Sequence, residues 1–88
     1  VYTSTHDTQT LAGAFPDEDP ADLVELALGS RAALAVVPVQ DVLGLGDEAR
    51  MNRPGETEGN WRWRLQPGEL TAAHAAWLRA AAAASGRA

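Results

Sequence analysis

The segment VYTSTHD, residues 1–7, decides how the rest of the chain is interpreted. Its first five residues are β-branched, aromatic or hydroxyl-bearing, a composition typical of a β-strand. His6 and Asp7 follow at the carboxyl end of this strand, and residues 8–12 predict the start of a helix. Ligands and catalytic groups gather at the carboxyl ends of strands in parallel α/β folds, so His6 and Asp7 form a candidate site. A plainer interpretation also stands, because an Asp before a helix is commonly an N-cap that accepts hydrogen bonds from free backbone N–H groups.

The following segments predict a second helix and a second strand. Residues 8–15 could form one or two helical turns, and a longer helix is expected to begin at Pro20, with Asp19 as its N-cap, and to end near Gly29. Its expected apolar face comprises Leu23, Leu26 and Ala27. Residues 32–37, AALAVV, are apolar without alternation, as expected for a strand covered on both faces of a parallel sheet. The order strand, helix, strand indicates a parallel βαβ unit with a right-handed crossover, and therefore an α/β fold.

The C-terminal half contains one long loop and one clear helix. Residues 39–46 predict a turn and a short helical segment, and residues 47–59 a loop of a length that is usually functional or disordered. Residues 61–65, WRWRL, alternate as a short strand does. Residues 70–85 predict a helix capped by Thr71. Its expected apolar stripe comprises Ala73, Trp77, Ala80 and Ala84, and Trp77 with Leu78 should provide most of its docking.

Composition limits the size and the chemistry of the chain. Its 88 residues make at most one small domain, and twelve acidic against seven basic residues give a net charge of -5. This charge makes nucleic acid and anionic membranes poor partners. The absence of cysteine excludes disulfides and thiolate metal sites. No apolar run approaches the roughly 20 residues of a membrane span, and no signal peptide is recognisable. Because the chain starts at Val1 in mid-strand, we expect a piece of a longer cytoplasmic protein.

Several common site motifs are missing or incomplete. His6 and His74 are the only histidines, so a zinc site is not expected, and His74 should be solvated on the polar side of the last helix. Ser4 is not part of a hydrolase triad, because neighbouring strand residues point to opposite faces and the Gly-x-Ser-x-Gly elbow is absent. Residues 44–46, GLG, lack the third glycine and the lysine of phosphate-binding loops.

The alternating tryptophans Trp61 and Trp63 allow three interpretations. They could pack in a core, stack on sugar rings through the apolar face of the indole, or stack on single-stranded nucleic acid beside arginines. The net charge disfavours the third interpretation.

Four blocks of the sequence stand in a characteristic order: VYTSTHD at 1–7, PVQDVLGLG at 38–46, EARMN at 48–52 with PG at 54–55, and GNW at 59–61 with WR at 63–64. Together they closely resemble the C-terminal end of the 4-α-glucanotransferases, a family also called amylomaltase or disproportionating enzyme. The resemblance covers nearly the whole chain. It implies that residues 1–88 are an incomplete domain, namely the last two strand-helix units of a (β/α)8 TIM barrel.

The resemblance also implies an activity. Enzymes of this family transfer a segment of an α-1,4-glucan to the 4-hydroxyl of another glucan with retention, and they need no cofactor or metal. Retention requires a carboxylate nucleophile and a second carboxylic acid. In this family both lie on earlier strands, so the 88-residue chain should be inactive by itself. Its expected partners are the glucan substrate and the remainder of the same barrel.

The resemblance assigns roles to three residues. Asp7 matches an essential carboxylate that stabilises the transition state, whereas His6 and Asn52 match residues that bind the sugar. Three further polar residues are expected at the barrel mouth, paired with one another: Gln40, Asp41 and Arg50. The chain departs from the family at residues 8–9, Thr-Gln, where many members have Asn-Asp, and between Leu11 and Pro20, where it is shorter by about a helix.

Two other functions remain possible on the sequence. A non-catalytic carbohydrate-binding or interaction module would explain the missing catalytic pair together with Trp61, Trp63 and the long polar loop. An RNA-binding segment built on residues 61–64 would require salt-dependent binding to single strands.

Overall fold

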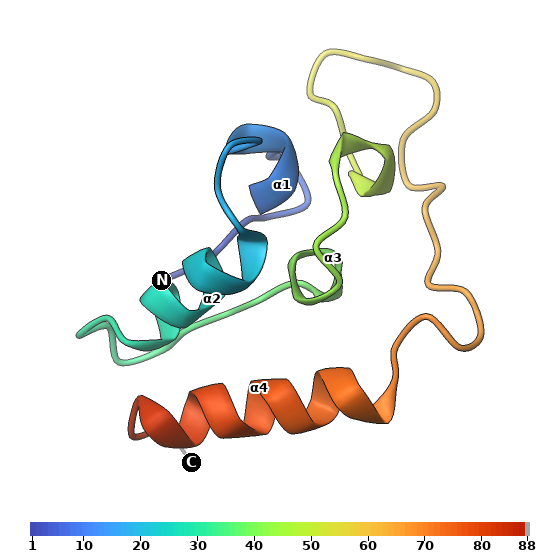
Figure 1. Cartoon of the computed structure of the whole chain (residues 1–88). Coiled ribbons are helices and arrows are strands. Elements are labelled where there is room, and N and C mark those ends of the chain that lie inside the picture. The colour runs from blue at the N-terminus through green and yellow to red at the C-terminus, as the bar shows by residue number, and fades with distance from the viewer. Residues whose placement is uncertain (88) are drawn as a thin grey trace.

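The computed structural model of the chain describes residues 1–87, which form four α-helices and one 3-10 turn (Figure 1). In chain order these elements are α1 (Leu11–Ala14), α2 (Pro20–Leu28), α3 (Val39–Val42), the 3-10 turn η1 (Asp47–Ala49) and α4 (Ala72–Ala84). Helix α2 contacts α1, α3 and α4, so the packing centres on it. Helix α4 lies along one side, and the loop after η1 extends away from the helices (Figure 1).

The two N-terminal segments that were predicted to be strands lie side by side and parallel, but they make only an isolated bridge. Tyr2 pairs with Val36. The N–H of Thr3 donates to the carbonyl of Val36 over 3.1 Å, and the N–H of Val36 donates to the carbonyl of Val1 over 2.8 Å. The predicted parallel pairing is therefore confirmed, whereas the prediction of regular strands over 1–5 and 32–37 is wrong. A parallel pair without further neighbours is only marginally stable, which explains the short contact.

The prediction of a third strand over residues 61–65 is also wrong. Trp61 has a positive φ of 60°, and residues 62–66 are irregular. The only backbone bond of this segment to a distant residue within 1–87 joins the Trp61 N–H to the carbonyl of Met51. Alternation of aromatic and charged residues cannot form a strand without a neighbouring backbone to pair with.

Helix α2 begins and ends where the sequence predicts, but of its predicted apolar face only Leu23 packs against the core. The side chain of Asp19 accepts a hydrogen bond from the Ala21 N–H over 3.0 Å, and Gly29 is the C-cap. The buried residues are Val24 and Leu28, which form the core with Leu11. Leu26, expected on the apolar face, is 72% exposed. The three neighbouring helices pack on the side of Val24, and a residue two positions further along a helix points about 200° away.

Helix α4 confirms its predicted cap and corrects its predicted stripe. The Thr71 hydroxyl accepts from the His74 N–H, and His74 Nδ1 accepts from the Thr71 N–H over 3.0 Å, a reciprocal capping box. His74 is therefore a half-buried cap partner rather than a freely solvated residue.

The side chains that dock α4 are Trp77, Leu78 and Ala81, which pack against the core. The docking role of Trp77 and Leu78 is confirmed, whereas three predicted stripe residues, Ala73, Ala80 and Ala84, are exposed. Alanines lie on every side of this helix, so the largest apolar side chains decide which side faces the core.

Arg87, which follows α4 near the end of the chain, joins the end of α4 to the end of α2. Its guanidinium donates to three backbone carbonyls, those of Leu28 (2.6 Å), Ser30 (3.2 Å) and Ala32 (2.8 Å). The carbonyls at a helix C-terminus lack partners within the helix, and Arg87 satisfies one of them from outside.

The corrected face of α2 leads to a stability prediction. We expect Val24→Ala to lower the free energy of unfolding by about 2 kcal/mol, because it removes two fully buried methyl groups and leaves a cavity. Urea-induced unfolding measures this change. Leu26→Ala is the matched control on the same helix and should change stability by less than about 0.5 kcal/mol. Equal losses for the two variants would contradict the observed orientation of α2.

Candidate functional site

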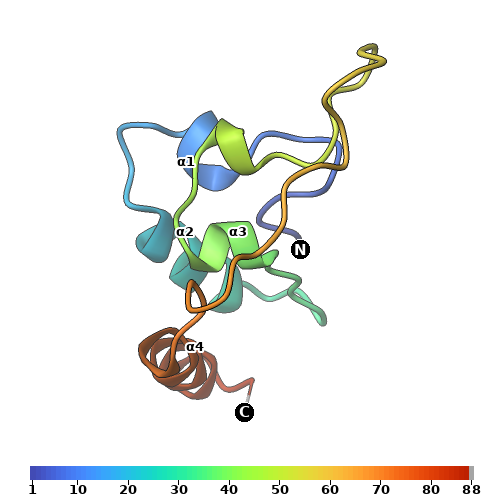
Figure 2. The same ribbon diagram turned by 90° about the vertical axis from the view of Figure 1, so that its right-hand side faces the viewer.

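The predicted site residues come from two segments that are far apart in the sequence and adjacent in the structure. The N-terminal segment leading to α1 runs beside the beginning of the loop that follows η1 (Figure 2). The N–H of Asn52, in this loop, donates to the carbonyl of His6 over 3.0 Å. This backbone contact brings the side chains of the two segments together.

The structure brings together all three residues to which the resemblance assigns a role. Asn52 Nδ2 donates to Asp7 Oδ1 over 2.6 Å, across 45 positions of sequence. His6 Nε2 lies 3.0 Å from Asp7 Oδ2. The side chains of His6 and Asp7 are 56% and 50% exposed. Both carboxylate oxygens are therefore oriented by a neighbour, and the group stays accessible from outside.

The alternative role of Asp7 as a helix cap is wrong. The N-cap of α1 is Thr10, whose hydroxyl accepts a hydrogen bond from the Gly13 N–H over 3.2 Å. Asp7 lies three residues before this cap and makes its side-chain contacts with His6 and Asn52 instead.

Arg50 connects the two site segments. One terminal nitrogen donates to the backbone carbonyl of Asp7 over 2.8 Å, and Nε donates to the carbonyl of Asn52 over 2.9 Å. A guanidinium offers several donors in a fixed plane, so one side chain fixes the separation of both backbones.

Asp41 holds the N-terminal segment in place through hydrogen bonds. This carboxylate of α3 is 1% exposed. It accepts three hydrogen bonds, from Thr3 Oγ1 (2.6 Å), Ser4 Oγ (2.6 Å) and the Leu11 N–H (2.9 Å). Hydrogen bonds to an ionised acceptor are shorter and stronger than neutral ones. Asp41 thus fixes the backbone on both sides of His6 and Asp7.

The expectation that Gln40, Asp41 and Arg50 pair with one another is wrong. Gln40 Nε2 donates to the carbonyl of Ala49 over 3.3 Å, and the other two bind the partners described above. Each of these polar groups is paired, as expected. Their partners are backbone groups and hydroxyls, which pair with buried polar side chains more often than other charged side chains do.

Trp61 lies next to the site; the sequence offered it as a core residue or as a ring that stacks on sugar or nucleic acid, and it was not among the predicted site residues. Its indole ring is 5.3 Å from the imidazole of His6, measured between centroids, with an interplanar angle of 32°. The side chain is 59% exposed, so the core interpretation is wrong for Trp61, whereas Trp63 is half-buried. The sequence signal that could have found it is the pair Asn60-Trp61 after a glycine, which indicates a turn that presents an aromatic ring.

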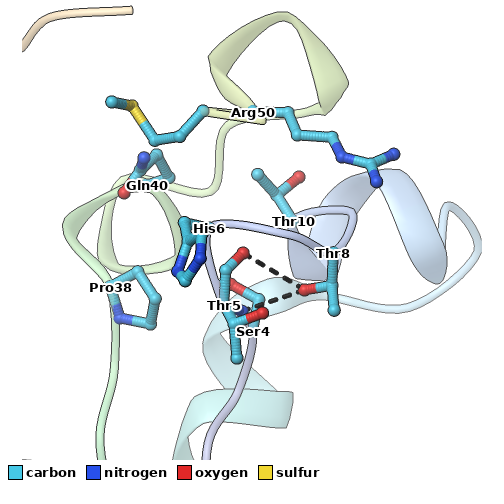
Figure 3. A pocket seen from close by; sticks show the side chains of 9 residues that line it. Ser4, Thr5, His6, Thr8, Thr10, Pro38, Gln40 and Arg50 are labelled. Carbon is cyan, nitrogen blue, oxygen red and sulfur yellow. Dashed lines mark hydrogen bonds between the residues drawn. The ribbon is translucent and has the colours of Figure 1, made fainter. Parts of the chain in front are cut away.

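A cavity of about 170 Å³ lies behind His6. Hydroxyl-bearing residues of the N-terminal segment line it together with His6, Pro38, Gln40 and Arg50 (Figure 3). Asp7 and Asn52 are not part of its wall. Its volume is below the roughly 300–1,000 Å³ of ligand pockets.

Two kinds of feature, a metal-ligand cluster and a membrane-spanning helix, are not found in the described part of the chain. Residues 1–87 contain no group of three or more His, Cys, Asp or Glu side chains placed to hold a metal ion. Over the same residues no helix has the length and apolarity needed to cross a membrane.

Comparison with known proteins identifies the family. The profile of glycoside hydrolase family 77, described as 4-alpha-glucanotransferase, matches residues 15–71. The 4-alpha-glucanotransferase of Thermus thermophilus is 45% identical over 111 residues, which cover 99% of this chain and 22% of that protein. That of Synechocystis is 42% identical over 89 residues, covering 80% of this chain and 18% of that protein. The chain thus spans about a fifth of the length of these relatives.

A solved structure confirms the fold. The amylomaltase from Streptococcus agalactiae, in complex with acarbose, superposes with a TM-score of 0.92 at 22% identity over 98% of this chain and 21% of its own.

The match to the T. thermophilus protein extends over 111 residues, more than the 88 of this chain. That relative therefore has residues inside the matched span that have no counterpart here. This agrees with the expectation that the chain is shorter than its relatives. The expected position of the missing residues, between Leu11 and Pro20, stays a prediction. Since the family profile covers more than half of its residues, the chain belongs to the 4-alpha-glucanotransferase family.

Proposed function

We propose that this chain is the C-terminal part of a catalytic barrel whose complete protein is a 4-α-glucanotransferase. The complete protein would transfer a segment of an α-1,4-glucan to the 4-hydroxyl of another glucan or of glucose, with retention. The observation that carries the proposal is the meeting of His6, Asp7 and Asn52, from distant segments, in a member of this family. The profile match begins at residue 15, whereas the match to the T. thermophilus protein covers 99% of the chain and so includes His6 and Asp7.

Asp7 would stabilise the transition state through its charge. Glycoside cleavage passes through an oxocarbenium-like transition state, and a fixed carboxylate beside the sugar ring opposes the developing positive charge. An ionised carboxylate has about four acceptor sites. His6 and Asn52 occupy one on each oxygen, which leaves acceptor sites for sugar hydroxyls.

His6 and Asn52 would bind the glucan and orient Asp7 at the same time. The imidazole and the amide are hydrogen-bonding groups, and each has a second polar atom besides the one that contacts Asp7. The acarbose complex of the S. agalactiae amylomaltase supports a glucan-like ligand for this fold.

The placement of residues 1–88 as the last two strand-helix units of a (β/α)8 barrel is part of the proposal. The parallel bridge between Tyr2 and Val36 supports it, as does the helix α2 between these two residues. Several large apolar side chains of the two bridged segments are exposed, namely Val1, Tyr2, Leu34 and Val36. Neighbouring strands of the same barrel would cover them and complete the small cavity behind His6.

The two other carboxylates that retention requires would come from earlier parts of the protein. The side-chain contacts of Asp7 within the described residues are an imidazole and an amide, not a second carboxyl group. No cofactor is proposed. We propose a cytoplasmic location for the complete protein. A relative in Solanum tuberosum is named chloroplastic/amyloplastic.

Disproportionation of maltotriose tests this function. The full-length protein should convert maltotriose into glucose and longer maltooligosaccharides, as resolved by chromatography. The purified 88-residue chain should give no product above the blank, because it lacks the nucleophile and the acid. Transfer by the isolated chain would contradict the proposed division of residues, and its absence from the full-length protein would contradict the function.

A non-catalytic carbohydrate-binding module is the alternative class, and no contact or comparison favours it. The reading frame upstream of Val1 distinguishes the two. Several hundred codons of barrel sequence support the enzyme, and a start codon directly before Val1 supports the module.

A further inference from the structure

Trp61 is a large aromatic residue beside the site with no role in the chemistry proposed above. It is 59% exposed, so core packing does not explain its position. The one aromatic ring it contacts within the described residues is the imidazole of His6, with centroids 5.3 Å apart and planes inclined by 32°. This separation lies within the range of favourable aromatic pairs.

His6 has few other restraints on its side chain. The imidazole is 56% exposed, and its polar contact is the one to Asp7 Oδ2 at 3.0 Å. A single hydrogen bond restrains the position of Nε2 but only weakly restrains the tilt of the ring plane, and the indole limits this tilt. The ring contact therefore helps to set which way the second imidazole nitrogen points.

The backbone of Trp61 is held in an unusual conformation that fixes the direction of the ring. Its φ of 60° is rare for a residue with a side chain, and the surrounding structure must stabilise it. The Trp61 N–H donates to the carbonyl of Met51. The neighbouring Asn60 closes the loop, since its Oδ1 accepts from the Arg53 N–H over 2.8 Å and its Nδ2 donates to the carbonyl of Glu56 over 3.0 Å.

We infer that Trp61 is a positioning residue of the transferase, whose indole ring holds the imidazole of His6 in contact with Asp7. The inference rests on the proposed function. The loop that carries Asn52 then supplies two elements of the site: an amide that binds Asp7 directly and an indole that acts on Asp7 through His6. Loss of the ring leaves His6 and Asp7 in place and makes the orientation of the imidazole variable.

A double-mutant cycle in the full-length enzyme tests this inference with maltotriose as substrate. Trp61→Ala should lower kcat about 10- to 100-fold and change KM less than about threefold, because loss of orientation in a reacting site is of this order. Trp61→Phe keeps a ring and should stay within about fivefold of the wild type. In a His6→Ala background, Trp61→Ala should cause no further loss, since the two residues act as a unit.

The control and the contrary outcomes separate this inference from its alternatives. Arg62→Ala, at the neighbouring exposed position, should leave kcat and KM unchanged. If Trp61→Ala does not fold, Trp61→Leu keeps apolar bulk without the ring and serves in its place.

A rise in KM that persists in the His6→Ala background would mean that Trp61 stacks on the sugar, and the inference would be overturned. If Asp7→Ala abolishes transfer and Trp61→Ala has no effect, only the inference fails; if Asp7→Ala has no effect, the proposed function fails.

Discussion

Asp7→Ala in the full-length enzyme is expected to lower kcat for glucan transfer by about 10³-fold, with the fold intact. Removing one preorganised electrostatic group that acts on a transition state costs on the order of 10²–10³ in kcat, and the loss of a full charge should lie at the upper end. The side chain is half exposed and contacts only His6 and Asn52 among the described side chains, so stability should change little. Initial rates of glucose release from maltotriose measure the effect.

Two further variants separate charge from shape at this position. Asp7→Asn keeps the size of the side chain and a hydrogen-bonding oxygen for Asn52, but it removes the charge, so it should be nearly as inactive as Asp7→Ala. Asp17→Ala removes an exposed acidic residue outside the site and should have wild-type rates. Turnover near the wild-type level in Asp7→Ala would exclude the role proposed for this carboxylate.

Asp41→Ala should have the largest effect on stability. The carboxylate is almost fully buried and accepts hydrogen bonds from two hydroxyls and the Leu11 N–H. The substitution leaves these donors without an acceptor, and each buried unsatisfied group costs about 1–3 kcal/mol. The hydroxyls can rotate towards other partners whereas the backbone N–H cannot, so we expect a total loss of about 3–5 kcal/mol. Denaturant-induced unfolding with and without the substitution measures it.

The same substitution should also affect transfer, because Thr3 and Ser4 lead directly to His6. Asp41→Asn keeps one acceptor oxygen and should lose less stability than Asp41→Ala. Asp22→Ala, on the exposed side of α2, is a matched acidic control that should be nearly neutral. A change of less than about 0.5 kcal/mol in Asp41→Ala would show that the buried hydrogen bonds do not stabilise the fold.

Features that depend on a few neighbouring residues were predicted correctly. Asp19 and Thr71 cap α2 and α4 as expected, because a capping side chain bonds to backbone groups two or three residues away. The short α3 and the irregular loop after it were predicted for the same reason, since proline and glycine act on their own backbone. His6 and Asp7 were proposed as a site from their position after an expected strand and Asn52 by resemblance, and no local pattern indicated that Asn52 would meet the other two.

Several features that depend on distant neighbours were predicted incorrectly. Leu26 was assigned to the buried face of α2 and is exposed, because the positions of α1, α3 and α4 select the face around Val24. Residues 61–65 alternate like a strand, but no strand of the described chain lies beside them. The partners of Asp41 are an N-terminal segment and a helix start that lie at least 30 positions earlier.

By itself, the sequence determined the helices α2 and α4 with their N-caps, the order of the segments and the family, because these follow from local backbone chemistry and from the order of characteristic blocks. Only the tertiary structure decided which helix faces are buried, which groups surround Asp41, and that Trp61 lies against His6. Packing and hydrogen bonding between distant segments depend on their positions in space, and no short stretch of sequence contains that information.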